Sequence, residues 1–200
     1  MATDDETYKI KRKAAIARMQ TRRDAAFLFD FETIAGLKVQ PLTLRLLILL
    51  DQVGSVFVTG KWRSLLEDNI GVELRKFLWL VSFEFSTDDD KSRRKFIKTV
   101  DGLDSAEVIN EIREYIDTAF TDAPGGSSRD DTPHASMAAE TVDLFAKEYG
   151  WGPDTILNLS MAQLWQYRNC ISARTEKNPI HFNRELDQYQ KEFMAERNRN

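Results

Sequence analysis

The chain has 200 residues, of which 42% are hydrophobic and 30% are charged, and its formal net charge at pH 7 is -4. This composition predicts a folded protein rather than a disordered chain, and the small negative charge excludes a bulk attraction to nucleic acid. Cys170 is the only cysteine, which excludes an intramolecular disulfide, and we expect it to be a small, semi-buried thiol. The charged N-terminus lacks the apolar core of a signal peptide, and the longest apolar run, 42–50, is too short to span a membrane. We therefore expect a soluble protein.

Residues 4–23 are predicted to form one helix, because neither proline nor glycine interrupts them. Ile10, Ala14, Ala17 and Thr21 give this helix only a thin apolar seam, so its own packing should hold it weakly. Seven basic side chains crowd it: Lys9, Lys11, Arg12, Lys13, Arg18, Arg22 and Arg23. We interpret it as a solvated or protein-docking helix. Nucleic-acid binding is the alternative, disfavoured because no aromatic residues are interleaved with the basic ones.

The middle of the chain is predicted to be mainly helical. Phe27, Phe29 and Phe31 alternate with other residues and predict a short strand or an irregular apolar segment, followed by a loop over 36–41. Segment 55–59 is a second short strand or a loop that plugs the core. Apolar periodicity predicts helices over residues 41–53, 62–70, 72–85, 91–100 and 105–120.

Two acidic segments are interpreted as helix starts. The run 88–90 consists of three aspartates, which favour the N-terminal end of a helix dipole. A metal site is the alternative, but the run lacks the ligand spacing of a calcium loop. Residues 104–107 resemble a capping box, with Asp104 as the cap.

Residues 122–132 combine proline, glycine, serine and charge without apolar anchors, which predicts a flexible linker. The linker divides the chain into a helical N-terminal domain, 3–121, and a small helical C-terminal domain, 133–200. Helices are predicted in the C-terminal domain over 133–149, 154–159, 160–174 and 184–198. The predicted fold class is all-α, with one short β segment as an option.

We find no pattern that predicts catalysis. The two histidines, His134 and His181, have no partner at metal-ligand spacing, and Gly125-Gly126 is not followed by the Lys-Ser/Thr of a phosphate-binding loop. We therefore expect no catalytic residues, no metal, no cofactor and no enzymatic activity.

Tyr149-Gly150-Trp151, followed by Pro153, has a direct physical interpretation. Gly150 can adopt the left-handed conformation that ends a helix, and Pro153 can begin the next one. Trp151 can then fold back onto the apolar face of the preceding helix. The motif predicts a helix-turn-helix corner with an aromatic plug.

The stretch 139–173, which contains this corner, resembles tail-assembly chaperones of long-tailed bacteriophages. The run 41–55 also looks like the first core helix of such proteins, and together the two stretches cover about a quarter of the chain. The resemblance implies a protein of the host cytoplasm, or of the virion, that binds the tape-measure protein, with tail-tube subunits as a further option. Such clients would present apolar helices to an apolar groove. The residues expected to line the binding surface are Tyr149, Trp151, Trp165 and Tyr167.

Two other functions fit the same composition. The first is a structural virion protein of the tail, neck or baseplate. The second is a nucleic-acid-binding module that uses the basic N-terminal helix, whose binding should weaken steeply as salt rises.

Overall fold

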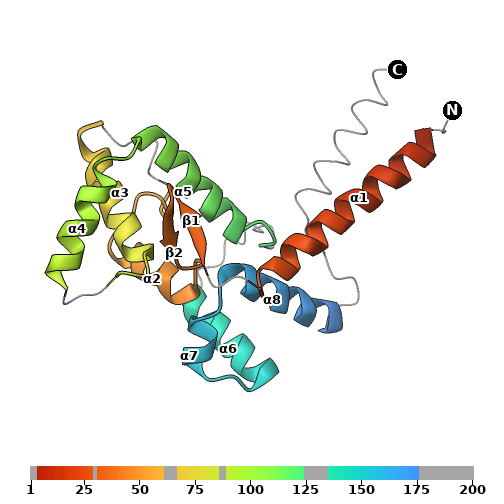
Figure 1. Ribbon diagram of the computed structural model, residues 1–200. Coiled ribbons are helices and arrows are strands. Elements are labelled where there is room, and N and C mark those ends of the chain that lie inside the picture. The colour runs from red at the N-terminus through yellow and green to blue at the C-terminus, as the bar shows by residue number, and fades with distance from the viewer. Residues whose placement is uncertain (1–3, 29–30, 61–66, 86–88, 124–134, 176–200) are drawn as a thin grey trace. The chain divides into compact units, whose positions relative to one another are not determined.

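The computed structural model describes residues 4–28, 31–60, 67–85, 89–123 and 135–175 (Figure 1). The contacts of the chain divide it into two compact units. The first unit comprises Met1–Phe29, Phe120–Arg129 and Ala162–Asn200, and the second comprises Asp30–Ala119 and Asp130–Met161.

Both units draw segments from both sides of the predicted linker at 122–132. Most of that linker lies in 124–134, outside the described residues, so the predicted domain division stays a prediction. The predicted helix over 184–198 and both histidines, His134 and His181, also lie outside the described residues.

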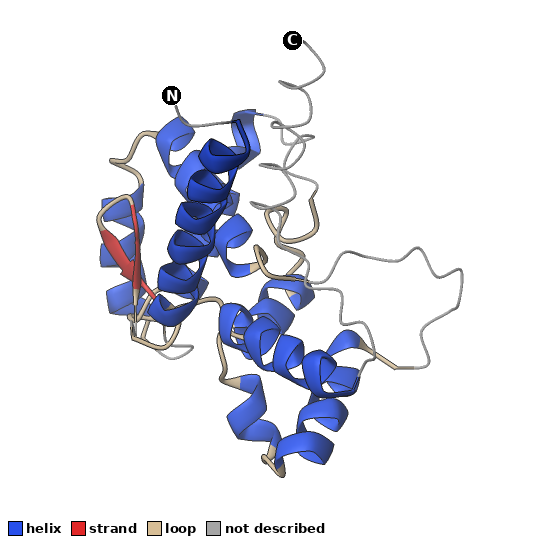
Figure 2. Ribbon diagram, turned by 90° about the vertical axis from the view of Figure 1, so that its right-hand side faces the viewer, coloured by secondary structure: helices blue, strands red, loops and turns tan. Residues whose placement is uncertain are grey.

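The predicted fold class is confirmed, because the described residues are mostly helical with one small sheet (Figure 2). The helices are α1 (Asp4–Ala25), α2 (Leu44–Gln52), α3 (Glu67–Val81), α4 (Asp90–Val100), α5 (Ser105–Ala119), α6 (Met137–Tyr149), α7 (Pro153–Leu157) and α8 (Met161–Thr175). The strands are β1 (Glu32–Ile34) and β2 (Leu37–Val39), which pair antiparallel. In the described part of the chain, no helix has the length and apolar character needed to cross a membrane.

The hairpin corrects the prediction of a loop over 36–41, because that segment contains β2. Residues 26–28 form a turn, which agrees with the irregular apolar segment given as one of the two alternatives there. The two residues between the strands, Ala35 and Gly36, have φ angles of 49° and 76°, as a type I′ turn requires. Ile34 and Val39 are fully buried, so tertiary packing forms strands that are too short to show in a sequence pattern.

Helix α3 corrects a second prediction, because it continues through Gly71 instead of ending there. A glycine inside a helix costs about 1 kcal/mol relative to alanine. Burial of Leu74, Phe77 and Leu78 on this helix outweighs that cost. The preceding predicted helix, 62–70, lies largely outside the described residues.

Helix α2 begins later than predicted: Pro41, expected in its first turn, lies before it, and Thr43 is its N-cap. The Thr43 hydroxyl accepts a hydrogen bond from the Leu46 amide at 3.1 Å, as an N-cap does. Segment 55–59 forms turns rather than a strand, and it buries Ser55 and Phe57. Its interpretation as a loop that plugs the core is therefore confirmed.

The two acidic helix starts are confirmed. Asp89 accepts hydrogen bonds from the amides of Lys91 and Ser92, at 3.1 and 3.0 Å. Hydrogen bonding to Ser92 in particular lowers the pKa of the Asp89 carboxyl. Asp104 accepts from the amides of Ala106 and Glu107, at 2.8 and 3.1 Å.

The core of the second unit is centred on Phe77 of α3. Its ring packs edge-on against Phe57, with centroids 5.2 Å apart, and against Tyr115 of α5, with centroids 6.2 Å apart. On the same helix, Trp79 packs against Phe96 of α4 at 5.3 Å. Aromatic contacts from α3 thus join the plug segment, α4 and α5.

In the first unit, the C-terminal end of α1 is fixed by side chains of α8. Gln163 and Gln166 donate hydrogen bonds from their amide groups to the carbonyls of Ala26 and Arg23, at 3.0 and 2.8 Å. Both carbonyls lie at the C-terminal end of the helix, where carbonyls lack the usual partner four residues on; the Arg23 carbonyl also accepts from the Ala26 amide at 3.3 Å. The bonds hold this end of α1 against α8.

We predict that Phe77→Ala lowers the free energy of unfolding by about 3–5 kcal/mol, because it leaves a cavity at the centre of the aromatic core. Chemical denaturation of the variant measures this loss. Phe83→Ala is the matched control, since Phe83 lies just beyond the same helix but is exposed. Equal losses in the two variants would contradict the assignment of the core.

Candidate functional site

The predicted corner after α6 is present. Gly150 has a φ of 69° and ends the helix in the left-handed conformation, and Pro153 occupies the first turn of α7. Trp151 folds back as predicted: its ring stacks on Tyr149, with centroids 4.6 Å apart, and lies 6.3 Å from Phe145. The three rings, of Phe145, Tyr149 and Trp151, form one aromatic cluster.

Most apolar side chains of the α6 helix are only partly buried. Phe145 is its only fully buried residue. Met137 is 46% exposed, and other apolar side chains are half-buried. We call the following set the α6 surface: Met137, Val142, Leu144, Tyr149 and Trp151. All five belong to the second unit. At about 100° per residue, Met137 and Leu144 lie on one side of the buried Phe145, and Val142 and Tyr149 lie on the other.

The other two predicted surface residues lie in the first unit, on α8. Trp165 is only 8% exposed and packs against Phe120, with centroids 6.1 Å apart. Its side chain is therefore part of the packing. Tyr167 is half-buried and lies edge-on to Phe27 at 5.7 Å. The predicted four residues thus separate into two pairs on different units.

Cys170 of α8 is exposed, so the prediction of a semi-buried thiol was wrong. The buried positions of this helix include Leu164, Trp165 and Ile171. Cys170 immediately precedes Ile171 and is therefore rotated by about 100° away from it around the helix.

The predicted basic residues of α1 fall into two groups. Five of them are exposed: Lys9, Lys11, Arg12, Lys13 and Arg18. Arg22 and Arg23 instead reach a single oxygen of Asp122, each at 3.1 Å. Asp122 is buried, and sequence reasoning missed it because it was included in the linker.

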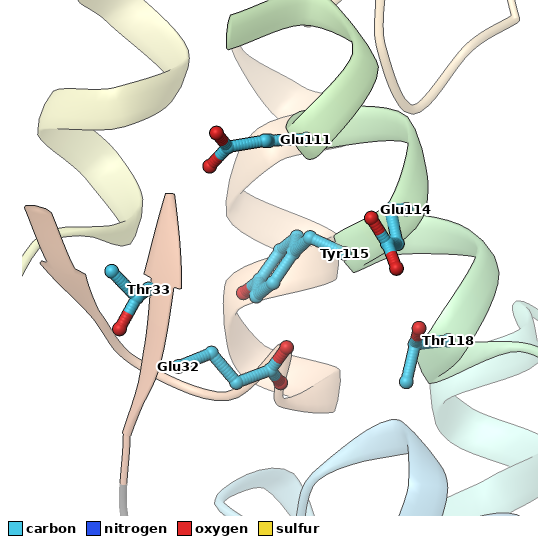
Figure 3. Close-up of a pocket in the computed structure, with 6 residues that line it drawn as sticks. All are labelled: Glu32, Thr33, Glu111, Glu114, Tyr115 and Thr118. Atoms are coloured by element: carbon cyan, nitrogen blue, oxygen red, sulfur yellow. The ribbon is translucent and has the colours of Figure 1, made fainter. Parts of the chain in front are cut away.

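A pocket of about 520 Å³ in the second unit was not predicted (Figure 3). Its lining comes from β1 and α5: Glu32, Thr33, Glu111, Glu114, Tyr115 and Thr118. Glu32 reaches from the strand towards α5, where Tyr115 lies beside it. Glu114 and Thr118 are exposed at its outer side.

Two groups of this pocket have structural hydrogen bonds. The Tyr115 hydroxyl donates to the carbonyl of Gln40 at 2.8 Å. The Glu111 carboxylate accepts a short hydrogen bond from the backbone amide of Ala35. Because Ala35 has a positive φ, this bond stabilises a turn conformation that residues other than glycine rarely adopt.

Burial governs the acid–base properties of the pocket. It raises the pKa of Glu32 from 4.5 to about 7, because desolvation disfavours the charged carboxylate. The pKa of Tyr115 is raised well above its usual value, first by burial and then by the negative charge of Glu32. Near neutral pH, therefore, Glu32 exchanges a proton while Tyr115 stays protonated. Among the described residues, no group of histidines, cysteines and acids has the arrangement of a metal site.

Comparison of the chain with models of protein families, with characterised proteins and with solved structures finds no match.

We predict that Glu32 makes the protein less stable as the pH rises from about 4.5 to about 7. The folded state binds this proton more tightly than the unfolded state, so the stabilisation is complete below the unfolded pKa and is lost as the pH passes the folded pKa. The loss amounts to at most about 3 kcal/mol, since a tenfold change in proton affinity is worth about 1.4 kcal/mol.

Glu32→Gln tests this prediction, because glutamine stays neutral. Urea denaturation at pH 5 and pH 8 should show a smaller fall in stability for this variant than for the wild type. Glu114→Gln is the control, since Glu114 lines the same pocket but is exposed. The prediction is contradicted if both variants keep the wild-type dependence on pH.

We also predict that Asp122→Asn lowers the free energy of unfolding by about 2 kcal/mol, because it leaves two half-buried arginines without their shared carboxylate. Thermal or chemical denaturation measures the loss. Asp143→Asn removes an exposed carboxylate of α6 and should change stability by less than about 0.5 kcal/mol. A loss no larger than this control's would show that the cluster does not stabilise the protein.

Proposed function

We propose that this protein is a non-enzymatic phage tail-assembly chaperone that binds apolar helical segments of a tape-measure protein, and also tail-tube subunits. The proposal rests on the resemblance of stretch 139–173 to such chaperones. The single observation that carries it in the structure is the α6 surface, where one helix fully buries only Phe145, exposes Met137 and leaves its other large apolar side chains half-buried.

The α6 surface has the chemistry that an apolar client helix needs. Full burial of a leucine or methionine side chain contributes about 1.5–3 kcal/mol, and a few such residues supply most of the energy of an interface. The stacked rings of Tyr149 and Trp151 offer a rigid edge on the side of α6 that carries Val142, and Leu144 and Met137 add apolar contacts on its other side. Gly150 and Pro153 hold this edge in a defined turn.

A surface contact joins α2 to the first turn of α7, directly after the corner. Arg45 of α2 forms an ion pair with Asp154 of α7 at 2.7 Å and donates a hydrogen bond to Asn158 at 3.1 Å. Because Arg45 and Asp154 are exposed, the pair contributes little to stability. It does orient α7, and with it the turn that carries Trp151.

The acidic pocket has no reaction assigned to it in this proposal. Its Tyr115 hydroxyl and its Glu111 carboxylate are engaged by the backbone of Gln40 and Ala35. These two groups hold the hairpin against α5, and their role in the proposal is structural.

We predict that Leu144→Asp and Met137→Asp each reduce recovery of the tape-measure protein at least tenfold when the tagged protein is isolated from infected cells. An aspartate would place a charge inside an apolar interface, which costs several kcal/mol. Quantitative mass spectrometry of the recovered proteins measures the effect. Val72→Asp is the control, because Val72 is an exposed apolar residue of α3 in the same unit.

Analysis of purified particles separates this function from that of a virion component. A chaperone of this kind should be absent from mature particles or present at low, variable amounts. A fixed copy number in the particles, with recovery of the tape-measure protein unaffected by the α6 variants, would replace the chaperone proposal with a structural role in the tail, neck or baseplate.

A further inference from the structure

The apolar seam of α1 faces outward. Ile10, Ala14, Ala17 and Thr21 are all exposed, Ile10 to 65%. Their separations of four, three and four residues place them on one stripe of the helix. The side chains that α1 buries are on another stripe and include Ala15 and Met19.

The seam is suited to close contact with a second helix. Its two alanines leave room for a partner backbone, and the Thr21 hydroxyl is bonded to the carbonyl of Ala17 at 3.1 Å. Thr21 can therefore present its methyl group without leaving its hydroxyl unsatisfied. The alternating spacing of three and four residues is that of a coiled-coil seam, and the stripe is about 16 Å long at 1.5 Å per residue.

Positive charges lie on both sides of the seam. At about 100° per residue, Lys9 and Lys13 lie about 70–110° to one side of it, and Lys11 and Arg18 lie at similar angles on the other. All four are exposed, and no acidic residue occurs between positions 7 and 23. These are the positions from which charged side chains select the partner of a coiled-coil helix.

We propose that the seam of α1 docks an amphipathic helix of a partner protein whose apolar stripe is flanked by carboxylates. The partner's apolar side chains would cover Ile10 and the alanines, and its carboxylates would pair with Lys11, Lys13 and Arg18. The match of charge on both sides identifies the chemistry of the partner.

The same charges argue against the other two occupants. A second copy of α1 would bring basic flanks against basic flanks, which is destabilising in either direction. A nucleic acid would meet an apolar stripe at the centre of the face, where phosphates find no donor. The α1 seam belongs to the first unit and the α6 surface to the second, so this inference does not depend on the proposed function.

The test uses the full chain and two synthetic peptides of about three heptads with the same apolar stripe. One peptide carries glutamate at the flanking positions and the other carries lysine. Fluorescence anisotropy should show at least tenfold tighter binding of the glutamate peptide, with an affinity that falls as salt is added.

Two variants locate the contact. Ala17→Gln blocks the seam without changing the charge, and the double variant Lys11→Gln/Lys13→Gln removes a charge from each flank. Each should weaken binding of the glutamate peptide at least tenfold. The matched controls are Ala139→Gln on α6 and Lys95→Gln/Lys98→Gln on α4, all at exposed positions, and these should bind as the wild type does.

Other outcomes overturn the proposal. Equal binding of both peptides, or binding that Ala17→Gln leaves unchanged, would show that no helix docks on the seam. Tight binding of a DNA duplex of about 20 base pairs that depends on the lysines but not on Ala17 would assign the helix to nucleic acid. A dimer in sedimentation analysis that Ala17→Gln abolishes would assign the seam to a second copy. Circular dichroism of each variant ensures that a loss of binding is not a loss of helix.

Discussion

The contact between Phe77 and Tyr115 is the one on which the second unit depends. Phe77 is fully buried and joins α3 to the plug segment through Phe57 and to α5 through Tyr115. Tyr115 extends the connection, because its hydroxyl holds the carbonyl of Gln40, directly after β2. The amide of Gln40 in turn donates to the carbonyl of Val81 at the end of α3. The contacts of Phe77 and Tyr115 thus link α3, α5 and the hairpin to one another.

These contacts explain why so short a hairpin is stable. Strands of three residues are not stable by themselves, and here they are held by Tyr115 at one end and by the bond from Ala35 to Glu111 at the other. Packing of the hairpin against α5 also removes Glu32 from solvent. The raised pKa of Glu32 is therefore a consequence of packing the hairpin, and it makes the stability of the hairpin sensitive to pH in the neutral range.

Local signals allowed much of the helical fold to be predicted from the sequence. Asp89, Asp104 and Gly150 each end or begin a helix through contacts with residues only a few positions away, and the corner at Trp151 follows from the same local rules. Three features could not be predicted from local signals: the hairpin, the continuation of α3 through Gly71, and the acidic pocket. Contacts between residues far apart in the sequence determine them. Glu32 and Tyr115 are separated by most of the second unit's sequence, and no spacing in the chain indicates that they meet.

For α1, the periodicity of apolar residues did not predict which face of the helix packs. The sequence identified the seam of Ile10, Ala14, Ala17 and Thr21, but a helix with few apolar residues has more than one stripe that could pack. Its rotation is set at the C-terminal end, where Arg22 and Arg23 converge on the buried Asp122.

Around the helix axis, Arg22 and Arg23 lie about 50° to either side of the direction in which Ala15 and Met19 point. Because both arginines bind the carboxylate of the buried Asp122, Ala15 and Met19 face the interior of the first unit. The seam residues lie about 120–180° from that direction and are left facing outward. A buried acid that a sequence pattern assigns to a linker thus determines which face of the basic helix is available to a partner.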